Sequence, residues 1–402
     1  MVSECHSLTA EGNRPIILCL IGFYLPGYRA GGPVRSIANF VEHLGDEFDI
    51  RVVTRDCDLL SCSPFNEVTI DGWNRVGKAN VFYASKKTLS LFGISRILCE
   101  TPHDILYLNS FFDFQFTTLP LLARKLCFAP KKSCVIAPRG EFSPGALALK
   151  TQKKFLYLKL VKFFNLFANL TWQASSCFEC VDIQRMMAMI ANDIKVASDL
   201  PTVGIIKRHQ APLRCTQGGK SQLHIVFLSR ICRMKNLSFL LKALHYSNKN
   251  IHLNIYGPLE DSDYWVQCQS LIATLPVNIT VKNLGVVDPS RVLDVFSVHD
   301  LFVLPTCGEN YGHVVLESLI AGTPVLISDK TPWQATSDDV VQVLPLADPF
   351  RWASALDRWA MIGLDQRLKL RVSASNYSRQ HIESSTVIEK NRSIFLKALH
   401  SS

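Results

Sequence analysis

Short apolar runs alternate with longer segments of helical spacing along most of the chain. Apolar runs bounded by polar, Gly or Pro residues are typical of strands that helices cover on both faces of a parallel sheet. They predict strands over 16–24, 49–55, 80–85, 104–109, 133–138, 171–175 and 194–198, and again over 224–229, 252–257, 279–282, 301–305, 324–328 and 340–344. The spacing predicts helices near 33–44, 87–99, 115–127, 145–168, 178–190, 234–247, 262–275, 288–297 and 312–321.

This alternation predicts an α/β protein with two doubly wound, Rossmann-like parallel-sheet domains facing each other across a cleft. We place the first domain at residues 1–200 and the second at 223–348. A polar connection with Pro and Gly lies between them at 201–222, and only helical pattern remains over 349–402. Ligands of such sheets bind at the carboxyl ends of the strands, so residues just after strands are the candidates for function.

Composition excludes several classes of protein. The 402 residues are 48% hydrophobic and 19% charged, which is unlike a disordered chain. The net charge of +9 suits nucleic acid, an anionic membrane surface or phosphorylated substrates, and does not choose among them. No apolar run reaches the ~18 residues that a membrane-spanning helix needs, and residues 15–25 lack the flanks of a signal peptide.

The cysteines favour a reducing compartment. Thirteen are spread along the chain without the spacing of a disulfide framework, mostly in hydrophobic surroundings, so we expect free thiols. The pair Cys177 and Cys180 has no second pair at the distance that zinc ligands need. We therefore expect a cytoplasmic protein.

The segment 301–334 has the richest chemistry. A strand leads into a loop with Glu309, and a helix that begins after Gly312 carries Glu317. The first amides of a helix have no internal partner and suit sugar hydroxyls or anionic oxygens. The two glutamates can hold two parts of one ligand; the alternative, a capping glutamate plus an exposed helical one, stays open.

Two cations lie at a second strand end. Arg230 ends the strand near 224–229, and Lys235 opens an amphipathic helix. A guanidinium and an ammonium at such a place can bind a diphosphate, although basic residues beside a helix are more often solvated.

Together the two segments resemble the signature of family-four retaining glycosyltransferases of the GT-B fold. The matching features are Arg230 and Lys235, the two glutamates with seven residues between them, and a small-residue turn before the Pro324-Val325 strand. The resemblance implies that Glu309 contacts the donor sugar and that Glu317 binds the nucleotide ribose. It also implies that the backbone of Asn310, Tyr311, Gly312 and His313 lies near the sugar and phosphate, and that the terminal helices cross back to the first domain.

The loop after the first strand carries Gly31 and Gly32, and paired glycines alone usually mean only a turn. By resemblance, the loop faces donor phosphate and acceptor, and the stretch 25–38 is similar to bacterial surface-polysaccharide proteins. Asn109, where many family members carry His, and Arg139 and Glu141 follow other strands and are candidates for acceptor or cleft contacts.

No metal or other cofactor is expected. Asp56 and Asp58, like Asp261 and Asp263, resemble metal-binding Asp-x-Asp motifs, but no other ligand-like residues accompany them and solvated loops explain both. By resemblance, GT-B enzymes generally need no catalytic metal.

The segment 150–167 is basic, aromatic and helical in pattern. Such a helix suits the surface of an anionic bilayer, here the inner face of the plasma membrane. Nucleic acid would suit the charge, but no nucleic-acid-binding motif accompanies it. An ordinary domain helix with solvated lysines explains the pattern equally well.

The hypothesis from the sequence is thus a retaining, metal-independent hexosyltransferase. It would move a sugar from a nucleoside-diphosphate sugar to a glycan, one carried on a membrane lipid, in lipopolysaccharide or exopolysaccharide synthesis. A GT-B sugar-nucleotide epimerase and an inactive sugar-nucleotide-binding subunit stay open. A nicotinamide dehydrogenase is disfavoured because no G-x-G-x-x-G follows the first strand.

Overall fold

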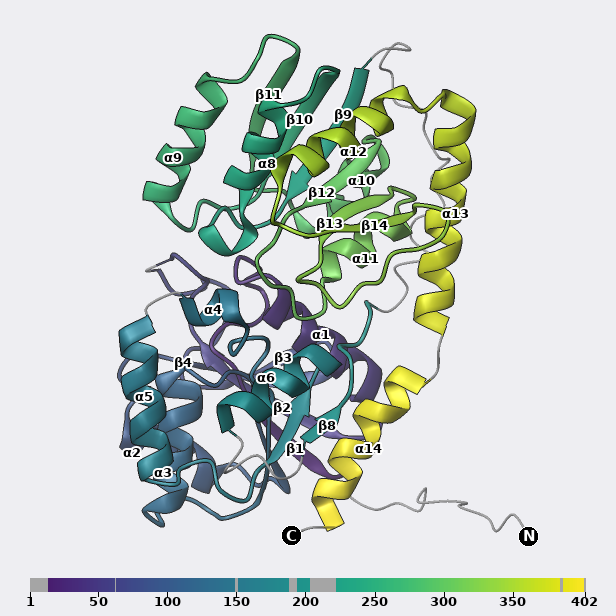
Figure 1. Cartoon of the computed structure of the whole chain (residues 1–402). Helices are drawn as coiled ribbons and strands as arrows, with labels where there is room; N and C mark the ends of the chain where they lie inside the picture. Colours follow the sequence, from purple (N-terminus) through teal and green to yellow (C-terminus); the bar gives the residue numbers. More distant parts are fainter. Residues whose placement is uncertain are drawn as a thin grey trace, which may run out of the picture.

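The computed structural model describes residues 14–61, 63–148, 151–187, 194–202, 222–383 and 386–400. Within them the chain forms two α/β domains, each built on its own sheet (Figure 1). Most of the predicted connection, 203–221, lies outside the described residues. The prediction of two parallel-sheet domains is confirmed.

The sheet of the N-terminal domain has the strand order β3-β4-β2-β1-β5-β6-β7-β8 among the described residues. Its strands are β1 (Ile16–Leu20), β2 (Asp49–Arg55), β3 (Trp73–Val76), β4 (Ala79–Ala84), β5 (Ile105–Leu108), β6 (Ser133–Ile136), β7 (Thr171–Ala174) and β8 (Ile194–Val196). The C-terminal sheet has the order β11-β10-β9-β12-β13-β14. These strands are β9 (Gln222–Leu228), β10 (Asn250–Tyr256), β11 (Ile279–Gly285), β12 (Leu301–Leu304), β13 (Val325–Ser328) and β14 (Val341–Leu344).

Helices cover both faces of each sheet. The N-terminal domain has α1 (Gly32–Leu44), α2 (Leu91–Glu100), the π-helical turn η1 (Phe114–Thr118), α3 (Leu119–Lys125), α4 (Pro144–Ala148), α5 (Thr151–Phe163) and α6 (Cys177–Met187). The C-terminal domain has the short turns η2 (Arg233–Lys235) and η3 (Pro289–Arg291), and α8 (Leu237–His245), α9 (Ser262–Ala273), α10 (Val292–Ser297), α11 (His313–Ile320) and α12 (Pro349–Met361).

Every neighbouring strand pair but one is parallel in the described sheets, and the central strands β5, β12 and β13 are buried along their whole length. This burial explains their unbroken apolar runs. The exception is β3, which pairs antiparallel with β4 at the sheet edge. Its residues are only half-buried or exposed, so it lacks an apolar run, and the sequence did not predict it.

The end of the chain crosses between the domains. Helix α13 (Leu364–Glu383) lies along the C-terminal domain, and α14 (Thr386–His400) lies against the N-terminal one (Figure 1). On α14 the buried ring of Phe395 is 4.9 Å from that of Phe40 and 5.0 Å from that of Tyr107. The last helix is therefore part of the N-terminal core.

Two predicted helices differ in the structure. Lys235 does not open a helix: it ends the turn η2, and Asn236 takes a left-handed φ of 58° before α8 begins. The helix predicted over 145–168 is divided between α4 and α5 and ends at Phe163. All cysteines in the described residues are free thiols, as expected. None of the helices that the structure describes has the length and apolarity needed to span a bilayer.

Candidate functional site

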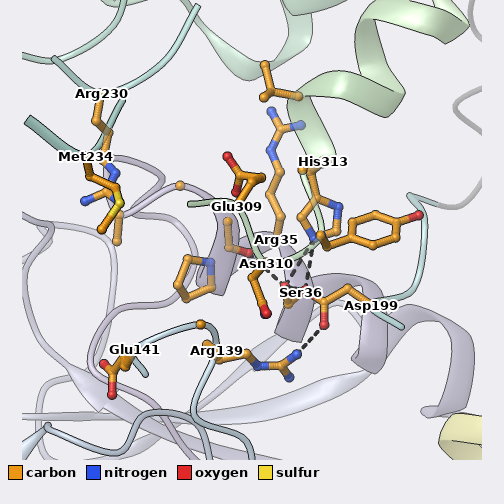
Figure 2. A pocket seen from close by; sticks show the side chains of 18 of the residues that line it. Arg35, Ser36, Arg139, Glu141, Asp199, Arg230, Met234, Glu309, Asn310 and His313 are labelled. Atoms are coloured by element: carbon orange, nitrogen blue, oxygen red, sulfur yellow. Dashed lines mark hydrogen bonds and ion pairs between the residues drawn. The ribbon is translucent and has the colours of Figure 1, made fainter. Parts of the chain in front are cut away.

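A cavity of about 530 Å³ lies between the two domains at the carboxyl ends of the central strands (Figure 2). All the candidate catalytic, donor-binding and acceptor residues from the sequence line it. From the N-terminal domain come Gly31, Gly32, Asn109, Arg139 and Glu141, and from the C-terminal domain come Arg230, Lys235, Glu309, Asn310, Tyr311, Gly312, His313 and Glu317. The strand-end rule thus places these residues around one space.

An ion pair joins the two C-terminal segments. Lys235 Nζ lies 2.6 Å from Glu309 Oε2, and both side chains are largely buried. Lys235 is positioned by the turn after β9, and Glu309 by the loop after β12, where its amide donates to the carbonyl of Lys330. Adjacent strands therefore present a cation and a carboxylate to the same part of the cavity.

A hydrogen bond from Trp333 fixes the loop before α11. The indole N–H of Trp333 donates to the carbonyl of Tyr311 at 2.7 Å. Gly312 has a φ of 82°, and a Cβ there would lie 3.0 Å from the Trp333 indole nitrogen and 3.2 Å from Cγ of Glu309. Since both the backbone conformation and the space favour glycine, Gly312 fixes where Glu309 and the first turn of α11 lie.

The other C-terminal cations have partners of their own. Arg230 lies 2.6 Å from Glu260 and is about one third exposed, and Arg233 lies 3.2 Å from Asp261. Arg230 alone of these two lines the cavity. Its guanidinium is therefore available to an anion only in competition with Glu260.

Glu317 is not an exposed helical residue, so that alternative is wrong. It is 5% exposed and forms an ion pair with Arg35, which comes from α1 of the other domain. Arg35 was not singled out from the sequence. Its position one turn into the helix after Gly31 and Gly32 was the available signal.

A second polar cluster joins the domains at the base of the cavity. Buried Asp199 accepts hydrogen bonds from Arg139 and from Ser36 Oγ, the latter at 2.6 Å. His313, at the start of α11, places Nε2 3.1 Å from Ser36 Oγ and 3.6 Å from Asp199 (Figure 2). Asp199 follows the short strand β8 and is a strand-end residue that the sequence analysis passed over.

Electrostatics keep Asp199 and Arg139 charged. Burial raises the pKa of Asp199, but Arg139, His313 and Ser36 together hold it well below the ordinary value for an aspartate. Burial lowers the pKa of Arg139, and Asp199 with Tyr107 raises it above its ordinary value. Arg139 also donates to the Tyr107 hydroxyl at 2.6 Å and to Asn109 Oδ1 at 2.9 Å. Asn109 and Arg139, which both line the cavity, are thus hydrogen-bonded to each other.

Glu141 has an internal role as well. It accepts hydrogen bonds from the amides of Phe111 and Phe112 and from Ser110 Oγ, at 2.6 to 2.9 Å. Burial raises its pKa. These contacts fix the loop after β5 at the edge of the cavity.

The Asp-x-Asp pairs order local backbone. Asp58 accepts from the amides of Tyr28 and Arg29, at 3.1 and 3.3 Å, and so orders the glycine-bearing loop. Asp261 caps α9 by accepting from the amide of Tyr264. The solvated-loop interpretation is therefore too weak for these two residues. Among the residues that the structure describes, no cluster of three or more His, Cys, Asp or Glu side chains could hold a metal ion.

Comparison with known proteins relates this geometry to characterised folds. Residues 217–378 match the family model described as glycosyl transferases group 1. An uncharacterized glycosyltransferase of Methanocaldococcus jannaschii is 31% identical over 106 residues, which are 26% of each chain. A D-inositol 3-phosphate glycosyltransferase of Corynebacterium urealyticum is 25% identical over 203 residues, 46% of this chain and 47% of that protein. The chain thus spans less than half the length of these curated relatives.

Solved structures match over nearly the whole chain. A sucrose-phosphate synthase of Thermosynechococcus elongatus has a TM-score of 0.69 at 14% identity, covering 97% of this chain and 100% of that one. Anabaena HepE, in complex with UDP and glucose, has a TM-score of 0.67 at 13% identity, covering 96% and 100%. At such identities the likeness concerns the fold alone, and the chain has the GT-B fold.

We predict that removing one partner of the buried Arg139–Asp199 pair strongly destabilises the protein. Asp199→Leu should lower the free energy of unfolding by about 3–5 kcal/mol, because it leaves a buried guanidinium without its carboxylate. The double variant Arg139→Met/Asp199→Leu should lose less than the sum of the two single losses. Urea unfolding of the four proteins measures this coupling, and additive losses would contradict it. Since the pKa of Asp199 is depressed, the contribution should be complete above about pH 4 and fall as the pH drops further.

Proposed function

We propose that the protein is a retaining glycosyltransferase that transfers a hexosyl group from a nucleoside-diphosphate sugar to a glycan. The observation that carries this proposal is the Lys235–Glu309 pair at 2.6 Å in the interdomain cavity. It combines a cation for the departing diphosphate with a carboxylate for the sugar. The match of residues 217–378 to glycosyl transferases group 1 and the UDP and glucose complex of HepE support the same class of donor.

The reaction breaks the bond between the anomeric carbon and the diphosphate, so negative charge develops on the leaving group. Lys235, Arg230 and the first amides of α11 would stabilise that charge from fixed positions, without a metal. Glu309 would orient the donor and stabilise cationic character on the sugar. Substitution on the front face retains configuration and needs no protein nucleophile.

The remaining cavity residues would place the two substrates. Glu317 would bind the ribose, and the backbone of 310–313 would lie near sugar and phosphate. Gly31 and Gly32 lie on the opposite wall of the cavity. A Cβ added at either glycine would meet no other atom within 4 Å, so there is room for a ligand. Asn109, Arg139 and Glu141 have internal partners, so they would shape the acceptor side rather than bind by free charges.

Two other functions of the same site are separable by product. A GT-B epimerase would release an isomerised free sugar, and a sugar-nucleotide-binding subunit would bind the donor without turnover. The Lys235–Glu309 pair favours turnover, because a binding protein needs no carboxylate beside the phosphate cation. Incubation with a panel of sugar nucleotides, with product sugar and nucleoside diphosphate followed together, distinguishes all three.

We further propose a lipid-linked acceptor in surface-polysaccharide synthesis, with α5 against an anionic membrane. Phe163 is 82% exposed, and Phe155, Leu156, Leu160 and Phe164 are also exposed. Lys153, Lys159 and Lys162 are exposed beside them. Lys125 at the end of α3 donates to the carbonyl of Phe164, which ties α3 to the end of this exposed surface.

Two lysines of the basic segment 150–167 are not available to a membrane in this proposal. Lys154 is half-buried, donates to the carbonyl of Ala146 at 2.6 Å and lies 4.9 Å from the centre of the Phe112 ring. It is thus tied to the protein. Lys150 lies outside the described residues. Three lysines remain for the membrane, at about 1 kcal/mol each near an anionic surface.

Lys235→Ala and Arg230→Ala should each lower turnover by ~10²–10³-fold, the scale seen when a preorganised charge-stabilising group is lost. Lys242→Ala is the matched control, because this exposed lysine lies on the following helix and outside the cavity. Release of nucleoside diphosphate measures the rates. Wild-type turnover in a folded Arg230/Lys235 double variant would refute the assignment.

Chelation should leave the reaction largely intact, because the proposed charge stabilisation comes from side chains and backbone amides. Turnover would be measured before and after dialysis against EDTA. Complete loss that manganese restores would instead require a catalytic metal.

Replacing Lys153, Lys159 and Lys162 with Gln should weaken binding to vesicles that contain anionic lipid. Wild-type binding should also weaken as salt rises from ~0.05 to ~0.5 M, because the Debye length shrinks. The control is the same change at three exposed lysines of the other domain, Lys242, Lys282 and Lys369. Equal binding by both triple variants and the wild type, in vesicle co-sedimentation, would exclude α5 as the anchor.

A further inference from the structure

Arg35 is an N-terminal-domain side chain whose ion-pair partner belongs to the other domain. Figure 2 shows its side chain extending across the cavity from α1. It pairs with Glu317 of α11. The Glu317 side chain is 7% exposed and that of Arg35 is 29% exposed. The carboxylate is therefore enclosed, while the guanidinium retains access to the cavity.

Arg35 lines two cavities that share part of their walls. It lines the 530 Å³ cavity with Lys235 and Glu309, and it also lines a second cavity of about 180 Å³. Gly31, Leu228, Ser229 and Arg230 are likewise shared by both. The second cavity is mainly apolar, with walls that include Pro258, Val286, Val287 and Val292. A ligand that occupies both cavities therefore has Arg35 and Arg230 among its neighbours.

A nucleoside-diphosphate sugar has the matching order of groups. Its base is flat and largely apolar, its diphosphate is doubly charged and central, and its sugar is polar. The ribose hydroxyls can donate hydrogen bonds to a carboxylate, and so can a guanidinium, which has donors only. Ribose and Arg35 therefore compete for Glu317, while the diphosphate offers Arg35 a partner of higher charge.

We propose that Arg35 binds the donor by exchanging partners: it pairs with Glu317 in the empty cleft and with the diphosphate in the donor complex. The inference rests on the proposed function and assigns a residue of the N-terminal domain to the donor. No covalent bond is formed or broken in this exchange. The ribose hydroxyls take over the hydrogen bonds of Glu317, and the guanidinium joins Arg230 and Lys235 around the phosphates.

The exchange predicts effects of opposite sign for two ligands. In Arg35→Gln the competitor for Glu317 is gone, so the nucleoside without phosphates should bind several-fold more tightly. The same variant should bind the nucleoside diphosphate about 10- to 100-fold more weakly, the scale of a lost charge-assisted contact. Arg35→Lys, which keeps the charge without the planar donor pair, should lie between wild type and Arg35→Gln for the diphosphate.

The experiment is calorimetric titration of the full chain. Wild type is first titrated with the common nucleoside diphosphates, and the one that binds is then used with its parent nucleoside on all variants. Arg51→Gln is the control, because Arg51 pairs with Asp49 inside the N-terminal domain and lines neither cavity. Melting temperatures verify that the variants are folded.

Each alternative role of Arg35 gives a different pattern. If Arg35 only ties the domains together, both ligands change in the same direction, and if it only binds phosphate, the nucleoside is unaffected. Either pattern overturns the exchange while wild-type binding and turnover leave the glycosyltransferase proposal standing. A wild type that binds no nucleoside diphosphate overturns both.

Discussion

The cleft is organised around a buried carboxylate, Asp199, whose partners come from both domains. A charge without water is costly unless cations and hydrogen-bond donors surround it. Arg139 and Ser36 supply these from the N-terminal domain, and His313 approaches from the start of α11. Because His313 follows Gly312 directly, this cluster and the loop that carries Glu309 are adjacent in the chain.

The polar contacts of the cavity fall into two groups: hydrogen bonds within the protein and ion pairs that a ligand can replace. Arg139, Asn109 and Tyr107 form a closed set of hydrogen bonds on the N-terminal side, and Glu141 closes another. The pairs Lys235–Glu309, Arg230–Glu260 and Arg35–Glu317 each contribute a cation to the cavity lining. Each of these cations is held by a carboxylate that a polyanionic ligand can replace.

The sequence predicts strands such as β5 and β12 well, because strands buried on both faces need unbroken apolar runs. It also places Lys235 and Glu309 at one sheet edge, since both follow strands of one parallel sheet, although it does not predict their ion pair. The edge strand β3 escapes prediction, because pairing at an edge requires few apolar residues. The short left-handed step at Asn236 also escapes, because nothing in a helical pattern marks it.

What local pattern cannot supply is pairing across the cleft. Ser36 and His313 are 277 residues apart in the chain, and their contact depends on how two finished domains face each other. The same holds for Arg35, which a helical pattern treats as one polar position among several. Asp199 differs from these, because it directly follows the strand predicted over 194–198, and the strand-end rule was sufficient to identify it.

The crossing of the chain end has a mechanical consequence. The polypeptide passes between the domains twice, once between residues 202 and 222 and once between α13 and α14. Two covalent connections restrict the relative motion of the domains more than one connection would. The side chains that span the domains, such as Arg35 and His313, therefore respond together to any opening of the cleft.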